Sequence, residues 1–358
     1  AHLDNDPYLV VSPEGRLLWF VDAYTTTDRF PYSEPTPRMG NYIRNTLKVI
    51  VDAYDGSVKV YVSDAKDPII RTYAAIYPGI FKKFEEMPLE LRSHVRYPSG
   101  MLKIQARMYR AYHMQDAQVF YNKEDLWTIP RAAAGGADQE MEPYYTIMKL
   151  PDDKKEEFIL MLPFTPVKKD NMSAWMAARC DAPNYGKIIV YNFPKQKLVY
   201  GPRQIEARIN QDPLISQQLS LWNQRGSQVI QGSLLAIPIE KSIVYVQPIY
   251  LAAEKGQLPE LKRVIVAFGN YIAMEETLEQ SLQRVFSGEV PKDTVAAAKP
   301  ETVPAGVKTD SQLITEAVAH YRKAQEQLRA GNWQGFGDEL KRLEAALTAL
   351  EKQVKGKK

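Results

Sequence analysis

The residues best suited to recognise a ligand lie in one polar segment, residues 200–225. This segment places three arginines among several amide side chains, and its candidate ligand-binding residues are Arg203, Arg208, Asn210, Asn223 and Arg225. Guanidinium groups beside amides, with Trp222 close in the sequence, suit recognition of a carboxylate, a phosphate or a sugar. The same residues equally suit a buried polar network that joins two layers of the fold. The sequence leaves both interpretations open.

A second polar segment, Val21–Ser33, supplies the other candidate ligand-binding residues, Thr26, Asp28 and Arg29. These residues lie close together between flanks that are rich in aromatic side chains. Hydroxyl, carboxylate and guanidinium groups in such a cluster are typical of a surface loop, and loops often carry binding residues. We therefore expect a loop at this position.

Motifs for covalent and metal chemistry are absent from the sequence. The one cysteine, Cys180, permits no intramolecular disulfide, and its surroundings are not those of a catalytic thiol. The four histidines are not spaced as metal ligands, and we expect structural roles for His94 and His113. Neither a glycine-rich phosphate loop nor a G-x-S-x-G turn occurs. We therefore expect no metal and no cofactor, and the chemistry favours binding over catalysis.

The net charge argues against a nucleic-acid-binding protein, and the hydropathy argues against a membrane-spanning helix within this sequence. Lys and Arg number 46 against 43 Asp and Glu, a net charge of +3, whereas nucleic-acid-binding proteins normally have a strong basic excess. We therefore expect no nucleic-acid partner. No run of 18 apolar residues occurs, so no membrane-spanning helix is predicted within this sequence. Hydrophobic residues make up 45% of the 358 residues, which is ordinary for a folded protein of more than one domain.

The polar segments must be positioned by a fold that mixes strands with helices. Asp55-Gly56 between two β-branched runs predicts a hairpin over Leu47–Ser63. Further strands are predicted at Tyr144–Leu150, Phe158–Leu162, Lys187–Phe193, Ser227–Ile239, Ser242–Tyr250 and Leu261–Phe268. Helices are predicted at Pro68–Tyr77, Pro98–Met114, Met172–Arg179, Asp212–Trp222 and Glu275–Phe286. Because short turns join neighbouring strands, we expect an α+β fold of mainly antiparallel sheets with packed helices.

The C-terminal part of the chain differs in composition from the rest. Residues 287–310 contain three prolines and no aromatic residue, which is typical of a linker. Over residues 311–354 apolar side chains recur at intervals of three and four, with a break at Gly331-Asn332, and this spacing predicts a two-helix hairpin. We therefore divide the chain into a body at 1–286, a linker at 287–310 and a hairpin at 311–354. The hairpin either docks on the body or mediates self-association or the binding of a protein partner.

Long blocks of the sequence resemble one protein family, in the same order along the chain. The longest of them are Asp6–Ser33, Asn41–Asp64, Glu156–Asp181 and Tyr200–Gly232. With shorter blocks between them, they extend from about Leu3 to Phe286. They resemble uncharacterised protein family 0182, which comprises large bacterial and cyanobacterial membrane proteins.

The resemblance implies a topology rather than a reaction. Members of the family carry an N-terminal bundle of transmembrane helices followed by a large extracytoplasmic portion, and this chain resembles the C-terminal part of that portion. It implies a cell-membrane location, with the body on the extracytoplasmic side and contact with the membrane through an N-terminal transmembrane region absent from this sequence. We expect a non-enzymatic domain that binds or scaffolds an envelope component. The alternative is a carboxylate-based hydrolase or transferase that acts on sugar or peptide substrates.

Truncation after Gly288 tests the predicted boundary between the body and the tail. We expect the truncated body to keep its sheets because the hairpin carries its own apolar faces. Circular dichroism during thermal unfolding measures this, and sedimentation of the full and truncated chains reports whether the tail mediates assembly. Unfolding of the truncated chain would show instead that the tail is part of the body's core.

Overall fold

The computed structural model describes residues 2–287, apart from 135–136, 152, 195, 197, 225, 240–241 and 254–257, together with a few residues near the C-terminus. Those residues are His320, Lys323, Glu339, Arg342, Leu343, Leu347 and Thr348. The chain divides into two compact units, Ala1–Val290 and Pro291–Lys358. Apart from these few residues and Ser287, the predicted linker and hairpin lie outside the described part of the chain. In the second unit, His320 Nδ1 and Glu339 Oε2 form a hydrogen bond of 2.6 Å.

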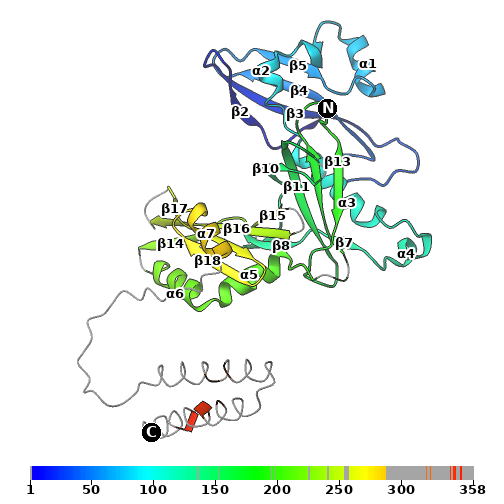
Figure 1. Cartoon of the computed structure of the whole chain (residues 1–358). Helices are drawn as coiled ribbons and strands as arrows, with labels where there is room; N and C mark the ends of the chain where they lie inside the picture. Colours follow the sequence, from blue (N-terminus) through cyan, green and yellow to red (C-terminus); the bar gives the residue numbers. More distant parts are fainter. Residues whose placement is uncertain are drawn as a thin grey trace. The chain divides into compact units, whose positions relative to one another are not determined.

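The first sheet of the body is formed by the N-terminal strands (Figure 1, blue). It contains β1 (His2–Leu3), β2 (Tyr8–Val11), β3 (Leu17–Thr27), β4 (Tyr42–Asp52), β5 (Val58–Val62) and β6 (Phe81–Lys83). The order is β1-β3-β4-β5-β6, with β2 also paired to β3, and only β5 and β6 run parallel among these pairs. The crossover between them is α1 (Pro68–Ile76), whose first turn is capped by Asp67.

The hairpin predicted over Leu47–Ser63 is confirmed by β4 and β5, but its turn is longer than a two-residue turn. Asp52 N donates to Ser57 O at 3.0 Å, so four residues lie between the last bonded pair. Within this loop only Gly56 has a positive φ, of 70°. A two-residue type I′ turn needs positive φ at both central residues, and Asp55 does not adopt it.

The second sheet contains the strand that the sequence analysis assigned wrongly. The sheet is formed by β7 (Trp127–Thr128), β10 (Tyr144–Lys149), β11 (Glu156–Pro166), β12 (Ala174–Arg179) and β13 (Ile188–Asn192). Its order is β10-β11-β12-β13, with β7 paired to β11. The helix predicted at Met172–Arg179 is strand β12, because the strand lies between two neighbours and is covered on both faces. Burial on both faces removes the alternation of apolar and polar residues that marks a half-exposed strand.

A 3₁₀ turn and three helices lie along the chain between the first and second sheets, and a small hairpin follows between β7 and β10 of the second sheet. They are a 3₁₀ turn at Phe84–Glu86, α2 (Leu89–Arg92), α3 (Ser99–Tyr112), α4 (Ala117–Asn122) and the strands β8 (Arg131–Ala134) and β9 (Ala137–Glu140). Leu102 and Ala106 of α3 are fully buried in one cluster with Leu160 and Leu162 of β11. The helix predicted at Pro98–Met114 is therefore confirmed, and it covers the second sheet.

The third sheet is covered by helices on both of its faces. It contains β14 (Ser227–Gln231), β15 (Leu235–Ile239), β16 (Ser242–Ala253), β17 (Glu260–Phe268) and β18 (Tyr271–Glu275) in the order β14-β16-β17-β18, with β15 also paired to β16. Ile265 packs with α5 (Pro202–Gln211) and α6 (Pro213–Trp222). Its neighbour Val266 packs with α7 (Leu278–Ser287) on the other face. Adjacent residues of a strand point to opposite faces, so one strand serves both layers.

The strand predicted at Ser227–Ile239 is interrupted in the structure. Gly232 lies at the break between β14 and β15, and a Cβ atom there would lie 2.7 Å from Pro248 Cγ. Only glycine fits so close to the neighbouring strand. With seven α-helices and mainly antiparallel strands in the described residues, the body has the expected α+β fold. In the same part of the chain no helix combines the length and the apolar composition that crossing a membrane requires.

A buried ion pair lies on the face of the first sheet that meets the second. The Lys48 ammonium and the Asp22 carboxylate form this pair, with side chains only 2% and 4% exposed. Lys48 Nζ also donates to Arg96 O at 3.2 Å. Asn45 Nδ2 donates to the hydroxyl of Tyr185, at 3.0 Å, and that hydroxyl donates to Arg96 O. Because Tyr185 lies between β12 and β13, the network connects both sheets.

Residues around Arg96 extend this network toward the second sheet. The Arg96 guanidinium lies over the rings of Tyr8, at 4.3 Å, and Tyr145, at 5.2 Å. Tyr145 donates its hydroxyl proton to Tyr97 O at 2.7 Å, and Tyr97 N donates to the sulfur of Cys180 at 3.4 Å. Cys180 is therefore a packed, hydrogen-bonded part of the core.

Replacing Lys48 alone tests how far the body depends on the buried pair. We expect Lys48→Met to lower the free energy of unfolding by about 3–5 kcal/mol, because it leaves the Asp22 carboxylate buried without its partner. The double variant Lys48→Met/Asp22→Leu should recover most of that loss. Urea unfolding measures both, with Lys59→Met at an exposed position of β5 as the control. A Lys48→Met loss no larger than the control's would contradict the role of the pair.

The thiol of Cys180 should be unreactive in the native protein. Burial raises its pKa to about 11, so the thiol stays protonated until the pH approaches that value, and only the thiolate is a nucleophile. We expect no labelling by a chromogenic disulfide reagent at pH 8, and one equivalent after unfolding in urea. Fast labelling of the native chain at pH 8 would show that the sulfur is accessible.

Candidate functional site

Helices α5 and α6 meet at a sharp corner, where Asp212 follows the end of α5 and caps the start of α6. Helix α5 ends there because the residue before a proline disfavours helical backbone, and α6 starts with Pro213. The Asp212 carboxylate accepts hydrogen bonds from Leu214 N at 3.0 Å and Ile215 N at 3.1 Å. These bonds satisfy amides that the first turn of α6 would otherwise leave unpaired. The corner therefore orients both helices.

The apolar side of this corner holds the helices against the third sheet. Ile205 and Ile209 of α5 and Ile215 of α6 are buried in one cluster with Ile249 and Ile265 of the sheet. Full burial of each such side chain contributes roughly 1.5–3 kcal/mol. With their apolar sides held in this way, the helices present fixed polar sides to solvent.

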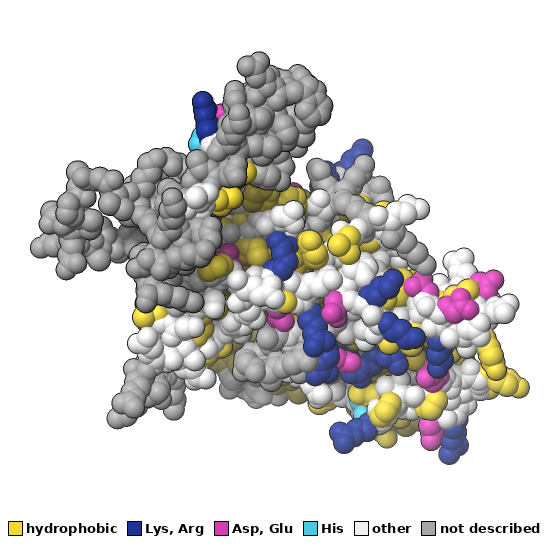
Figure 2. All heavy atoms as spheres, turned by 90° about the horizontal axis from the view of Figure 1, so that it is seen from below, with side chains coloured by type: hydrophobic (Ala, Val, Ile, Leu, Met, Phe, Trp, Pro, Cys, Tyr) yellow, Lys and Arg dark blue, Asp and Glu magenta, His cyan; other side chains and the backbone are white. Residues whose placement is uncertain are grey.

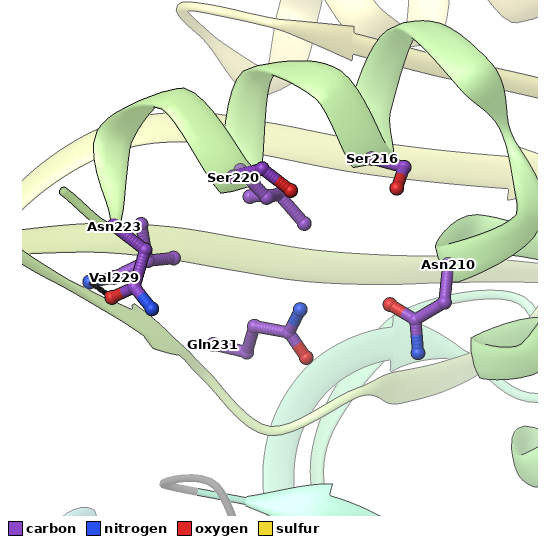
Figure 3. Close-up of a pocket in the computed structure, with 7 residues that line it drawn as sticks. Asn210, Ser216, Ser220, Asn223, Val229 and Gln231 are labelled. Atoms are coloured by element: carbon purple, nitrogen blue, oxygen red, sulfur yellow. Dashed lines mark hydrogen bonds between the residues drawn. The ribbon is translucent and has the colours of Figure 1, made fainter.

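A polar pocket of about 330 Å³ lies where α6 faces β14 and the end of α5. It is lined by three amides, two hydroxyls and two apolar side chains: Asn210, Asn223, Gln231, Ser216, Ser220, Leu219 and Val229. Figure 3 shows Ser216 and Ser220 on the side of α6 that faces Gln231, with Asn210 and Asn223 at the two ends. We call it the amide pocket.

The amide pocket has hydrogen-bonding groups but no charged group in its lining. Asn223 Oδ1 accepts a hydrogen bond from Val229 N at 3.1 Å, which orients that side chain (Figure 3). Within the described part of the chain, no protein group bonds to the side chains of Asn210, Ser216, Ser220 or Gln231. Amides and hydroxyls both donate and accept, so the pocket can bind a neutral ligand with hydroxyl or amide groups.

The structure separates the polar residues that the sequence placed in one segment. Asn210 and Asn223 come together in the amide pocket, but Arg208 and Arg203 do not join them. Arg208 Nη1 donates to Gly269 O at 2.6 Å, and its guanidinium lies 4.9 Å from the Tyr200 ring centre, so it fastens α5 to the turn before β18. Arg203 lines a different hollow with Lys169 and Asp170. Arg225 lies outside the described residues.

The second predicted segment belongs to another sheet. Thr26 lies in β3, paired with Ile43, so the expected loop begins later than predicted. Asp28 and Arg29 follow the strand and are largely exposed, 4.0 Å apart between Oδ1 and Nε. No hydrogen bond or ion pair connects them to α5 or α6 within the residues described. Thr25, the residue before Thr26, is buried, and its hydroxyl donates a hydrogen bond to Asp67 Oδ2 at 2.8 Å. Its role is therefore structural.

Sequence reasoning missed three polar residues of the amide pocket, and a signal for two of them was present. Ser216 and Ser220 are four residues apart in the helix predicted at Asp212–Trp222, with Asn223 three residues further, so they share one helix face. Gln231 carried no such signal, because its approach to α6 depends on how β14 pairs with β16. Among the described residues, no three His, Cys, Asp or Glu side chains lie close enough to bind a metal.

Comparison with known proteins places the chain in a family. Residues 1–222 match the model of the uncharacterised protein family UPF0182. A UPF0182 protein of Pelobacter propionicus is 57% identical over 98% of this chain, and one of Geobacter sp. strain M21 is 56% identical over 97%. A UPF0182 protein of Geobacter sulfurreducens is 52% identical, again over 97% of the chain.

These relatives are considerably longer than the chain. The chain spans 38% of the length of each of them. No solved structure matches the chain significantly. The resemblance seen in the sequence is confirmed by these matches, and the chain belongs to the uncharacterised protein family UPF0182.

Proposed function

We propose that the chain is a non-enzymatic binding domain that holds a neutral, N-acetylated sugar of the bacterial envelope in the amide pocket. The observation that carries this proposal is the lining of the pocket by three amides and two hydroxyls, without a charged side chain. A sugar hydroxyl both donates and accepts, and an acetamido group offers one donor and one acceptor. Both match amide and hydroxyl side chains, which can take either role.

The fixed geometry of the pocket adds support. Asp212 caps α6, and Ile205 and Ile209 hold α5 against the third sheet, so the polar side chains do not have to be assembled when a ligand arrives. Preorganisation reduces the entropy cost of binding. The apolar Leu219 and Val229 offer the pocket surface for the carbon skeleton of a sugar ring.

We also propose that the domain acts on the extracytoplasmic side of the membrane, attached through a transmembrane region of the longer protein. The support is the resemblance to a family of large bacterial membrane proteins. Self-association or binding of a protein partner through the C-terminal hairpin belongs to the same proposal. The alternative of a hydrolase or transferase needs two carboxyl groups that face each other across a cleft, roughly 5–10 Å apart. The lining of the amide pocket includes no carboxylate.

Titration of the full chain with N,N′-diacetylchitobiose tests the proposed ligand class. We expect Gln231→Leu to weaken binding about fivefold or more, because it removes both hydrogen-bonding groups of one side chain from the pocket. Gln218→Leu is the matched control, since Gln218 is exposed on α6 outside the lining of the pocket. Isothermal titration calorimetry measures the affinities.

Two outcomes would contradict the proposal. One is that the chain does not bind the disaccharide, and the other is that Gln231→Leu and Gln218→Leu bind it equally well. Release of free N-acetylglucosamine during the titration would favour the enzymatic alternative instead. Because neither the half-buried Gln231 nor the exposed Gln218 lies in the core, we expect both variants to unfold at the temperature of the unmodified chain.

A further inference from the structure

A second, larger cleft lies at one end of the second sheet, away from the amide pocket. It has a volume of about 890 Å³ and is formed by the end of α3, the segment Lys123–Trp127, the turn Pro166–Ser173 between β11 and β12, and Asn192–Pro194 after β13. We call it the lysine cleft. It shares no lining residue with the amide pocket.

Two aromatic side chains in the wall of the lysine cleft are buried with unsatisfied nitrogen atoms. The rings of His113 and Trp127 stack with centres 3.6 Å apart. His113 is 8% exposed in its side chain and Trp127 is 5% exposed as a residue. Neither His113 Nε2 nor Trp127 Nε1 has a hydrogen-bond partner in the described protein. A buried donor without a partner costs about 1–3 kcal/mol, so such atoms are uncommon unless something else binds them.

The hydrogen bonds around His113 define what the two nitrogens can do. His113 Nδ1 lies 3.1 Å from Tyr109 O, and because a carbonyl can only accept, Nδ1 carries the proton of that bond. Nε2 then faces Asp125 Oδ2 at 3.9 Å, too far for a direct hydrogen bond. The indole nitrogen of Trp127 can only donate. It is therefore a donor beside the cleft that lacks an acceptor.

Positive charge lines the same cleft. Lys123, Lys168 and Lys169 are exposed in its lining, and none of them forms an ion pair within the described residues. The lining also contains two carboxylates, Glu124, which accepts a hydrogen bond from Asn122 Nδ2 at 2.9 Å, and Asp125, which faces His113, so the ammonium groups outnumber the carboxylates by one. Figure 2 shows Lys and Arg side chains gathered on the face seen from below, with Asp and Glu among them.

We propose that the lysine cleft is a second binding site, which takes an anionic, oxygen-rich small molecule such as a sugar acid or a sugar phosphate. The three ammonium groups attract a carboxylate or phosphate, and Trp127 Nε1 supplies a further donor from the wall of the cleft. The amides of Asn171 and Asn192 line the same space and can bond to hydroxyls. This site differs from the amide pocket in charge, so the two select different ligands.

Trp127→Phe separates binding from structure. Phenylalanine keeps an aromatic ring beside His113 but removes the N–H that has no protein partner, so stability should not fall by the loss of a hydrogen bond. We expect the variant to weaken binding of glucose 6-phosphate and of galacturonate about fivefold. Calorimetry on the full chain measures both ligands, and glucose is the neutral control, whose affinity should be the same in the variant and in the unmodified chain.

Lys168→Gln/Lys169→Gln tests the charge without altering the buried wall. We expect it to weaken binding of either anion about tenfold or more, whereas Lys82→Gln on exposed β6 should change nothing. A stronger effect on one anion tells whether phosphate or carboxylate is the preferred group. Failure of both anions to bind, an equal loss of glucose affinity, or unchanged anion affinity in the double variant would each overturn the proposal. None of these results bears on diacetylchitobiose binding in the amide pocket.

Discussion

The body depends on keeping one pair of opposite charges out of water. A buried ammonium is tolerated only when its charge and its hydrogen-bonding capacity are satisfied by the protein. For Lys48 those partners are Asp22 on the neighbouring strand and the carbonyl of Arg96. Because Tyr185, in the loop between β12 and β13 of the second sheet, donates to the same carbonyl, the first sheet cannot shift against the second without breaking these bonds. The pair thus specifies how the two sheets align as well as where each lies.

A tyrosine makes the corresponding connection to the third sheet. The hydroxyl of Tyr144, on β10, donates to Ala236 O at 2.5 Å and accepts from Ala236 N at 3.2 Å, on β15. Burial raises the pKa of this hydroxyl, which therefore keeps its proton and both bonds at physiological pH. Tyrosine is suited to this position because its ring packs in the core while its hydroxyl bonds to backbone. The amide pocket and the lysine cleft thus lie in separate parts of a body whose sheets are joined by polar contacts.

Local signals predicted much of the fold, and they failed where neighbouring strands decide the structure. The helices around Ile70, Leu102 and Ile215 and the hairpin at Gly56 followed from the apolar period and the turn residues of the sequence. Strand β12 did not, because burial on both faces removes its alternation. Asn210 and Asn223 were predicted as binding residues, but their separation from Arg208 could not be. That separation depends on the corner at Asp212, where the chain turns so that α6 faces β14. Arg208, on the preceding helix, instead bonds to the carbonyl of Gly269.

That corner also determines how the amide pocket responds to insertions and deletions. Each added residue rotates the following helix by about 100° around its own axis, since an α-helix has 3.6 residues per turn. One extra residue after Asp212 would therefore move Ser216 and Ser220 off the face that looks toward Gln231. The same rotation would bring Ile215 away from the third sheet, so packing resists the change. The rotation of α6 about its own axis is consequently fixed by the packing of its apolar face. That packing also fixes the position of the polar face that lines the pocket.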